Sequence, residues 1–256
     1  GSYCDTIRDF NGCDTILCFT LSEPDTVLTS TTITNLTCNG ICNGTATTFV
    51  TGGTQPYTYV WDSIPNAGGF TAFDSIVSLC PGTYFVTVSD VFLCSVSDTL
   101  VITEPTPLTL SIDSTNITCN GDADGSIDIT VSGGTKDYSY LWSTTNGSGL
   151  DSNAEDQSGL GPGTYKVVVT DANDCTIEDT FNITQPDFAL SITDSLTNVS
   201  CNGGADGSID ITVSGGTTDY SYLWSTSDAS ITEDQTGLGP GTYKVIVTDA
   251  NGCTIE

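Results

Sequence analysis

The feature that most constrains this 256-residue chain is a unit of about 81 residues that occurs three times. The three tryptophans mark its period, since Trp61, Trp142 and Trp224 lie 81 and 82 positions apart. A fixed period of this length is typical of an array of similar domains. We therefore divide the chain into the C-terminal part of a preceding repeat and three repeats, at 1–24, 25–105, 106–186 and 187–256.

Both ends of the chain fall inside a repeat in this phase. Residues 1–13 align without a gap on 241–253, and residues 254–256 are in phase with 176–178, so the third repeat lacks its last strand. We therefore expect the chain to be a segment of a much longer polypeptide.

Within a repeat, apolar residues alternate with polar ones, as in a strand with one buried face. Ile127, Ile129 and Val131 share such a face in the second repeat, and no window shows helical periodicity. About seven short strands, with an aromatic pair on an early one and a Gly-Thr-Tyr sequence on a later one, predict an all-β fold of immunoglobulin-like sandwiches. We expect Trp142 in the core beside a disulfide and Tyr165 at a corner of the sandwich.

Proline-containing linkers at 104–107 and 184–186 join the repeats. Proline removes a backbone donor and stiffens the chain, so we expect the repeats to form an extended file.

The chain has 11 cysteines, and one pair of them recurs in every repeat. The recurrence predicts an internal disulfide in each repeat, joining Cys38 to Cys94, Cys119 to Cys175 and Cys201 to Cys253. The repeat phase also predicts bonds of Cys42 with Cys80 and of Cys4 with Cys18, and leaves Cys13 with a partner upstream. Such bonds persist outside a reducing cytosol, which predicts an extracellular location.

The charge balance excludes several classes of function. The chain has 4 Lys and Arg and 32 Asp and Glu, which gives a net charge of −28. This charge excludes nucleic acid as a partner and disfavours anionic membrane surfaces. No apolar run is long enough to span a membrane. Without any His, the usual nucleophile–base pairs cannot be assembled, so we do not expect an enzyme.

The second repeat contains short motifs at 118–121, 124–127, 132–135, 138–142, 163–165 and 170–175. Together they resemble the SprB repeat, which occurs in tandem in very large cell-surface proteins of Bacteroidota, including a gliding-motility adhesin. The resemblance is close over 119–175 and 201–253 and looser over 38–94. It implies export by the type IX system, a surface location, and adhesive or filament-forming work, and it transfers no catalytic residues.

The best candidate for a small-ligand site is a calcium site at Asn120, Asp122 and Asp124. Their oxygen side chains alternate before a glycine, as at the start of an EF-hand loop. Val131 stands at the twelfth position, where a bidentate carboxylate is needed, so an Asx turn is the competing interpretation. We expect no other cofactor.

Two kinds of glycan attachment are expected from short motifs. Asp followed by Ser or Thr and then an aliphatic residue or Thr resembles the O-glycosylation signal of Bacteroidota, and occurs at Thr6, Thr15, Thr26, Ser63, Ser75, Thr99, Ser114 and Ser195. The weaker Asn-x-Ser/Thr motif occurs at Asn35, Asn43, Asn116, Asn146, Asn182 and Asn198.

Three functions remain open at this point. The first is a structural and adhesive surface protein, in which tandem sandwiches form a fibre and the partners are neighbouring repeats and covalent glycans. The second is an array of carbohydrate-binding modules attached to a secreted enzyme, which would need an exposed aromatic platform and would bind polysaccharide. The third is a filament subunit whose identical chains join by strand donation, with 14–21 supplying the strand that the third repeat lacks.

Overall fold

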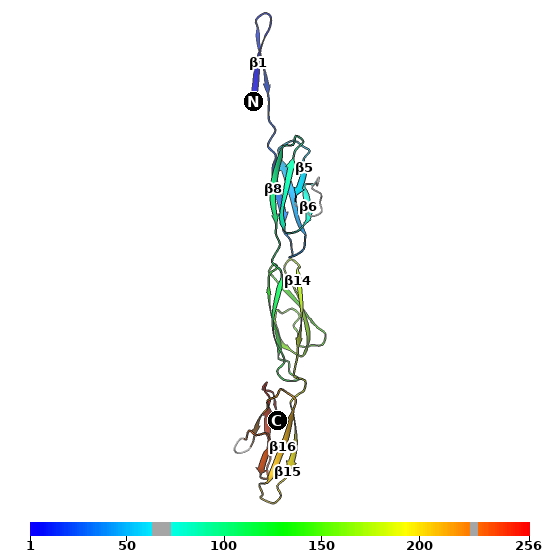
Figure 1. Cartoon of the computed structure of the whole chain (residues 1–256), viewed down its shortest axis with the longest axis vertical. Coiled ribbons are helices and arrows are strands. Elements are labelled where there is room, and N and C mark those ends of the chain that lie inside the picture. The colour runs from blue at the N-terminus through cyan, green and yellow to red at the C-terminus, as the bar shows by residue number, and fades with distance from the viewer. Residues whose placement is uncertain (63–72, 226–229) are drawn as a thin grey trace. The chain divides into compact units, whose positions relative to one another are not determined.

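The computed structural model describes residues 1–62, 73–225 and 230–256. All regular secondary structure in these residues is β-strand. They form two compact units, Gly1–Pro107 and Leu108–Glu256. The first unit contains a hairpin and one sandwich, and the second contains two sandwiches (Figure 1). No helix in the described part of the chain could cross a membrane.

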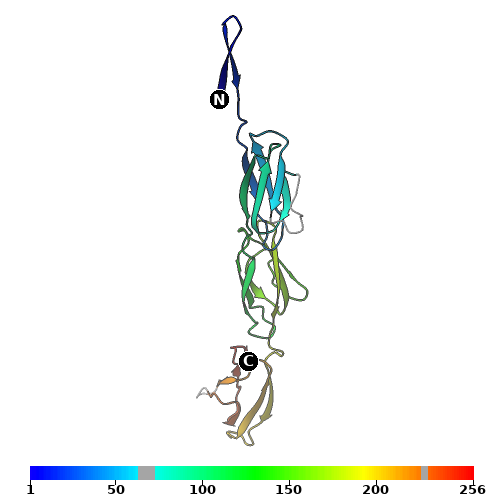
Figure 2. The same ribbon diagram turned by 45° about the horizontal axis from the view of Figure 1, so that its top comes forward.

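The hairpin consists of β1 (Ser2–Arg8) and β2 (Asp14–Thr20), and all of its residues are exposed. Tyr3 opposes Phe19, and the neighbouring pair, Cys4 and Cys18, forms a disulfide with Cα atoms 4.0 Å apart. No third described strand pairs with this hairpin (Figure 2). The disulfide therefore joins two adjacent strands, in agreement with the repeat phase.

The first sandwich has two three-stranded antiparallel sheets. Its strands are β3 (Leu28–Thr34), β4 (Gly44–Thr51) and β6 (Ser75–Leu79) in one sheet and β5 (Thr58–Asp62), β7 (Gly82–Ser89) and β8 (Ser95–Ile102) in the other. Trp61, Val86 and Ile102 lie in the core between the sheets and are almost completely buried.

The second sandwich repeats this arrangement 81 residues later. Its strands are β9 (Thr109–Thr115), β10 (Gly125–Ser132) and β12 (Gln157–Leu160) in one sheet and β11 (Ser139–Thr144), β13 (Gly163–Thr170) and β14 (Thr176–Ile183) in the other. The alternation read from the sequence is reproduced, since Ile127 and Ile129 of β10 are buried while Asp128 between them is exposed.

The strand order identifies each sandwich as immunoglobulin-like. The first, second and fourth strands of a repeat form one sheet and the third, fifth and sixth form the other, which corresponds to strands A, B, E and C, F, G of that fold. Trp142 lies on the third strand and is 2% exposed, so its predicted place in the core is confirmed. The hydroxyl of Tyr165 donates a hydrogen bond to the carbonyl of Gly161 at 2.8 Å, which is the predicted corner.

The predicted number of strands is wrong, because the second sandwich has six strands rather than about seven. The segment between β11 and β12 is a loop that folds against the core. A side chain at Gly147 would meet the Tyr165 ring at 2.4 Å, and the backbone at Gly149 has φ +81°. Only glycine suits both positions, so this segment follows the ring instead of forming another strand.

The third sandwich contains β15 (Ser191–Thr197), β16 (Gly207–Ser214), β17 (Ser221–Trp224), β18 (Gln235–Leu238), β19 (Val245–Thr248) and β20 (Thr254–Ile255). β20 has two residues, whereas β14 at the same position of the second repeat has eight. A groove of about 640 Å³ lies beside it, lined by Ile192, Ile211 and Trp224 among others. The core of this sandwich is therefore open where the sixth strand covers that of the second.

Candidate functional site: the junction between consecutive repeats

In the second repeat, the loop between the first two strands holds the linker that leaves the repeat. Asn120 Nδ2 donates a hydrogen bond to the carbonyl of Pro186 at 2.7 Å, and the N–H of Gly121 donates to Oε1 of Gln185 at 3.0 Å. Gly121 has φ +90°, a backbone conformation that favours glycine and here turns its N–H toward the linker. The loop thus fixes the course of the chain as it leaves the sandwich.

The first repeat uses the same contacts 81 residues earlier. Asn39 Nδ2 donates to the carbonyl of Pro105 at 3.0 Å, and the N–H of Gly40 donates to Oε2 of Glu104 at 2.7 Å. An acceptor side chain followed by proline is therefore a functional part of the linker. The stiffness of proline, which is the role predicted from the sequence, does not include this contact of the side chain before it.

A second asparagine in each of these loops reinforces the contact with the linker. Asn116 Oδ1 accepts the N–H of Thr184 at 2.9 Å, and Asn35 Oδ1 accepts the N–H of Thr103 at 3.0 Å. Both asparagines are among the N-glycosylation candidates, and their side-chain oxygens are occupied by this structural role.

Of the three predicted calcium ligands, two help to hold this loop. Asp124 Oδ1 accepts the N–H of Thr118 at 3.0 Å, and Asn120 contacts the linker as described above. The hydrogen bonds from Thr118 lower the pKa of Asp124 below its usual value. No group of three or more His, Cys, Asp or Glu suited to a metal ion occurs in the described ranges, which lack 63–72 and 226–229. The bond between Thr118 and Asp124 ties the two sides of the loop together, and the calcium site stays a prediction.

The turn between the last two strands is built on a buried aspartate that the sequence analysis missed. Asp171 is 4% exposed; its Oδ1 accepts the N–H groups of Asn173 and Cys175, and its Oδ2 accepts that of Thr135. Burial alone would raise the pKa of Asp171, but the three N–H donors outweigh it and hold the pKa below its usual value.

The same aspartate occurs four residues before the second recurring cysteine of every repeat. Asp90 and Asp249 are buried like Asp171, and N–H donors likewise lower their pKa values against the effect of burial. The regular spacing of Asp and Cys was the signal in the sequence that could have revealed this turn.

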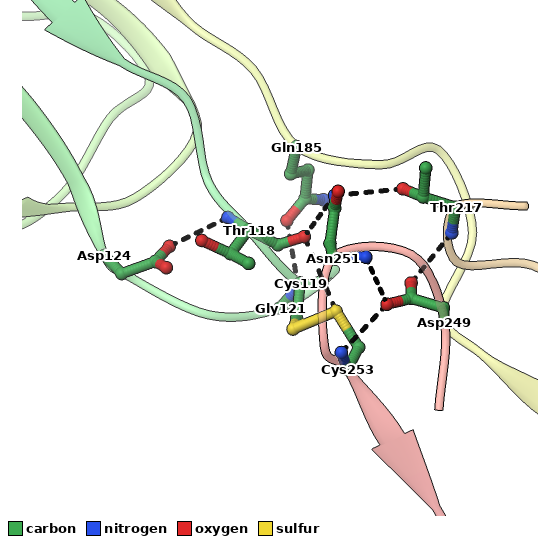
Figure 3. The surroundings of a disulfide bond; sticks show 9 residues. All are labelled: Thr118, Cys119, Gly121, Asp124, Gln185, Thr217, Asp249, Asn251 and Cys253. Carbon is green, nitrogen blue, oxygen red and sulfur yellow. Dashed lines mark hydrogen bonds between the residues drawn. A yellow bond between two sulfur atoms is a disulfide. The ribbon is translucent and has the colours of Figure 1, made fainter. Parts of the chain in front are cut away.

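A disulfide joins the two kinds of loop across consecutive repeats. Cys119, in the first loop of the second repeat, bonds Cys253, in the last turn of the third, at an S–S distance of 2.08 Å and a Cα–Cα distance of 5.7 Å (Figure 3). Asn251 Nδ2 donates to the carbonyl of Thr118 at 3.1 Å and to Oγ1 of Thr217 at 3.0 Å. The covalent bond thus has a hydrogen bond between the same two loops beside it.

The predicted internal disulfides are wrong because the two recurring cysteines lie at opposite ends of one sandwich. The loop with Cys119 precedes Gly125 at the start of β10, whereas the turn with Cys175 contacts the segment after Ser132 at the end of β10. An eight-residue strand spans about 23 Å, and a disulfide needs Cα atoms within about 7 Å.

Chain connectivity explains the observed pairing instead. The chain leaves the second sandwich after Ile183, which pairs with Gly163 at the end where Cys119 lies. It begins the third sandwich at Ser191, which pairs with Ser214 at the end where Cys253 lies. The first loop of the second repeat is therefore next to the last turn of the third repeat.

The remaining cysteines separate into bonded and free groups. Cys42 bonds Cys80 with Cα atoms 4.2 Å apart, in agreement with the repeat phase, and this is the internal disulfide of the first repeat. Cys38 and Cys175 are disulfide-bonded, whereas Cys13, Cys94 and Cys201 are free and exposed. The predicted bonds of Cys38 with Cys94 and of Cys201 with Cys253 are therefore absent.

The described O-glycosylation candidates are all on the surface. Thr6, Thr15, Thr26, Ser75, Thr99, Ser114 and Ser195 are exposed, and Ser63 lies outside the described residues. The N-glycosylation candidates Asn43, Asn146, Asn182 and Asn198 are exposed as well. Modification at these positions remains a prediction.

The aromatic residues considered for a carbohydrate platform contribute to the core instead. Trp142 is buried, and Tyr138 is half-buried with its hydroxyl donating to the carbonyl of Gly133 at 2.6 Å. Burial, with a hydrogen bond to Glu155, raises the pKa of Tyr140 to about 12. These three rings do not form an open platform.

Comparison with solved structures gives weak likenesses. Sidekick-1 immunoglobulin domains 1–5 match 100% of this chain and 64% of that one, at 12% identity and a TM-score of 0.40. The N-terminal eight Ig domains of Down Syndrome Cell Adhesion Molecule match 99% of this chain and 42% of that one, at 9% identity and a TM-score of 0.39. Bacteroides ovatus SGBP-B, in complex with a mixed-linkage heptasaccharide, matches 84% of this chain and 59% of that one, at 16% identity and a TM-score of 0.21.

The comparison with family models agrees with the internal repeat. No curated protein matches the chain. The SprB repeat model matches residues 30–66, 111–147 and 193–229, and each match begins within the first strand of a sandwich. The SprB repeat model thus matches one segment in each immunoglobulin-like sandwich.

Proposed function

We propose that this chain is a non-enzymatic, load-bearing segment of an extracellular surface adhesin, in which the repeats hold an adhesive part away from the cell. The proposal rests on the junction between the second and third repeats, where the linker is hydrogen-bonded and a disulfide joins Cys119 to Cys253. A spacer of this kind has to resist bending and pulling between its domains, and an enzyme or a flexible array of binding modules does not.

The contacts at the junction suit mechanical work. Without them, the linker at 184–186 would be the only connection between the second and third sandwiches. The disulfide adds a second covalent connection between the same sandwiches, and its two cysteines are 134 residues apart in the sequence. A pulling force is thereby shared between two covalent paths, and the linker itself is held to the loop by Asn120 and Gly121.

The charge and the exposed hydroxyls support a surface location. A net charge of −28 keeps neighbouring chains apart in water, and glycans on the exposed Ser and Thr candidates would extend that hydrated layer. In this proposal the type IX system exports the chain, as the SprB resemblance implies.

Antibodies raised against residues 1–256 test the location. On intact cells of the source they should label the surface as strongly as on permeabilised cells, and protease treatment of intact cells should remove the signal. Labelling confined to permeabilised cells would refute the surface role.

A pulling experiment on single molecules tests the mechanical role. The chain and its Cys253→Ser variant are held by tags at their two ends and stretched under oxidising conditions. The unmodified chain should reach a shorter extension on unfolding, because the disulfide between Cys119 and Cys253 keeps the residues between them in a closed loop. Equal extension of the two chains would contradict a load-bearing junction. Binding of the intact chain to a polysaccharide panel would instead favour carbohydrate recognition.

A further inference from the structure

The disulfide between Cys119 and Cys253 relates the cysteines of consecutive repeats by a simple rule. The cysteine in the first loop of the second repeat bonds the cysteine in the last turn of the third repeat. Under this rule Cys201, in the first loop of the third repeat, requires the turn cysteine of a further repeat, and Cys13 and Cys94 are turn cysteines that require an earlier loop. All three are free and exposed.

The loop around Cys201 already has the conformation that the bonded loop adopts. Asp206 Oδ1 accepts the N–H of Ser200 at 3.0 Å, as Asp124 does for Thr118 at the same distance. The carbonyl of Cys201 accepts the N–H of Gly204 at 2.9 Å. The corresponding bond at Cys119, to the N–H of Asp122, measures 3.1 Å. The free cysteine therefore lies in a preformed copy of a loop that is bonded in the neighbouring repeat.

The turn at Cys13 is the matching copy of the turn at Cys253. Asp9 Oδ1 accepts the N–H of Asn11 at 2.9 Å and that of Cys13 at 2.8 Å, the same distances that Asp249 shows to Asn251 and Cys253. Asn251 is also the residue that donates to the carbonyl of Thr118 beside the bonded cysteine. Asn11 stands at this position in the free turn, whereas Phe92 stands there beside Cys94.

We propose that Cys201 is a site for covalent attachment of the last turn of a further SprB repeat, recognised by an Asp-x-Asn-x-Cys turn whose asparagine donates to the carbonyl of Ser200. The further repeat belongs either to the same polypeptide or to a second copy of this chain. Two thiols lose two protons and two electrons to a disulfide oxidant such as oxidised glutathione, which is reduced to two thiols. The inference rests on the proposed function, because it continues the covalent path of the load-bearing junction to the next repeat.

Disulfide mapping of the native polypeptide tests the proposal directly. The material is digested without reduction, and the peptide joined to the Cys201 peptide is sequenced. We expect a cysteine with Asp four residues and Asn two residues before it. A partner peptide containing Cys13 would show that the source is a second copy, and any other turn of this type would show another repeat of the same polypeptide. A free Cys201, or a bond to a cysteine outside such a turn, would overturn the proposal.

The purified chain gives a second arm with a matched control. In a glutathione buffer, the yield of the disulfide between Cys201 of one chain and Cys13 of another should exceed the yield of the disulfide between two Cys201 residues. The expected ratio is about three- to tenfold, the contribution of one hydrogen bond. Asn11→Ala should abolish this preference, whereas Phe10→Ala in the same exposed turn should leave it unchanged. Equal yields of the two bonds in the unmodified chain would overturn the recognition step. Neither arm measures surface location or force, so a failure here is distinct from a failure of the proposed function.

Discussion

The ring of Phe181 packs against the indole of Trp142, with centroids 5.8 Å apart and planes tilted by 50°. Phe181 belongs to β14, the sixth strand of the second sandwich, and Ile183 of the same strand is 1% exposed. This strand completes the core of the second sandwich. The third sandwich has the equivalent Trp224 beside an open groove.

We predict that a C-terminal extension stabilises the third sandwich. Appending Asp-Thr-Phe-Asn-Ile-Thr, the sequence of 179–184, to Glu256 should raise its free energy of unfolding by roughly 2–4 kcal/mol, because Phe and Ile side chains would bury their surface in the groove. Thermal unfolding followed by tryptophan fluorescence measures the change. The control extension carries Ser in place of Phe and Ile, and equal stabilisation by it would contradict burial as the cause.

Removal of the junction disulfide should destabilise the second unit. Cys253→Ser is expected to lower the free energy of unfolding by about 2–5 kcal/mol, since the bond constrains a long stretch of the unfolded chain. Cys201→Ser is the matched control, because Cys201 is free and exposed, and it should have almost no effect. Calorimetry of both variants under oxidising conditions provides the comparison. Similar losses in the two variants would show that the loops, and not the bond, supply the stability.

The hydroxyl of Tyr165 should add to the free energy of unfolding beyond the burial of the ring. Tyr165→Phe keeps the ring but leaves the carbonyls of Ser148 and Gly161 without their hydroxyl donor. We expect a loss of about 1–3 kcal/mol in the free energy of unfolding, measured by urea denaturation. Tyr3→Phe, on the exposed hairpin, should be neutral. A neutral Tyr165→Phe would mean that the loop supplies another donor.

Acid should weaken the turns that carry the recurring cysteines. The pKa values of Asp90, Asp171 and Asp249 are lowered in the folded state, so their stabilisation is fully present above the unfolded pKa of about 4. It is lost as the pH falls through the lower, folded pKa values. Thermal unfolding between about pH 2 and pH 6 should show the melting temperature falling in this acidic range.

Asp171→Ala tests the cause of this pH dependence. The variant should lose roughly 2–3 kcal/mol at neutral pH, because three partly buried N–H groups lose their acceptor, and its acid dependence should be shallower. Asp128→Ala, on an exposed position of β10, should keep the acid dependence of the unmodified chain. An unchanged slope in Asp171→Ala would assign the effect to other carboxylates.

Proteolysis tests whether the hydrogen bond from Asn120 fixes the linker. Asn120→Ala removes the hydrogen bond to the carbonyl of Pro186, so cleavage within 184–190 should become several-fold faster while the sandwiches remain folded. Asn198→Ala, at an exposed position of the third repeat, is the control. Equal cleavage rates would show that Gly121 and Asn116 are sufficient to hold the linker.

The sequence by itself determined the architecture within each repeat. Period-two alternation places Ile127 and Ile129 on one face, and a large buried indole such as Trp142 has few places in a small sandwich other than its centre. The phase of the repeats also placed Cys42 near Cys80 and Cys4 opposite Cys18, because both pairs depend on contacts within one hairpin or one domain. These features follow from local periodicity and short-range connection.

Only the tertiary structure decided which recurring cysteines meet. Recurrence in every repeat is equally compatible with a bond inside one repeat and a bond between two, because the spacing in sequence is the same for both. The strand order separates Cys119 from Cys175 by the length of β10 and brings Cys119 to Cys253 instead. The buried Asp171 and the asparagines that hold the linkers were missed for the same reason, since their partners belong to other loops and the choice of partner depends on the path of the chain in space.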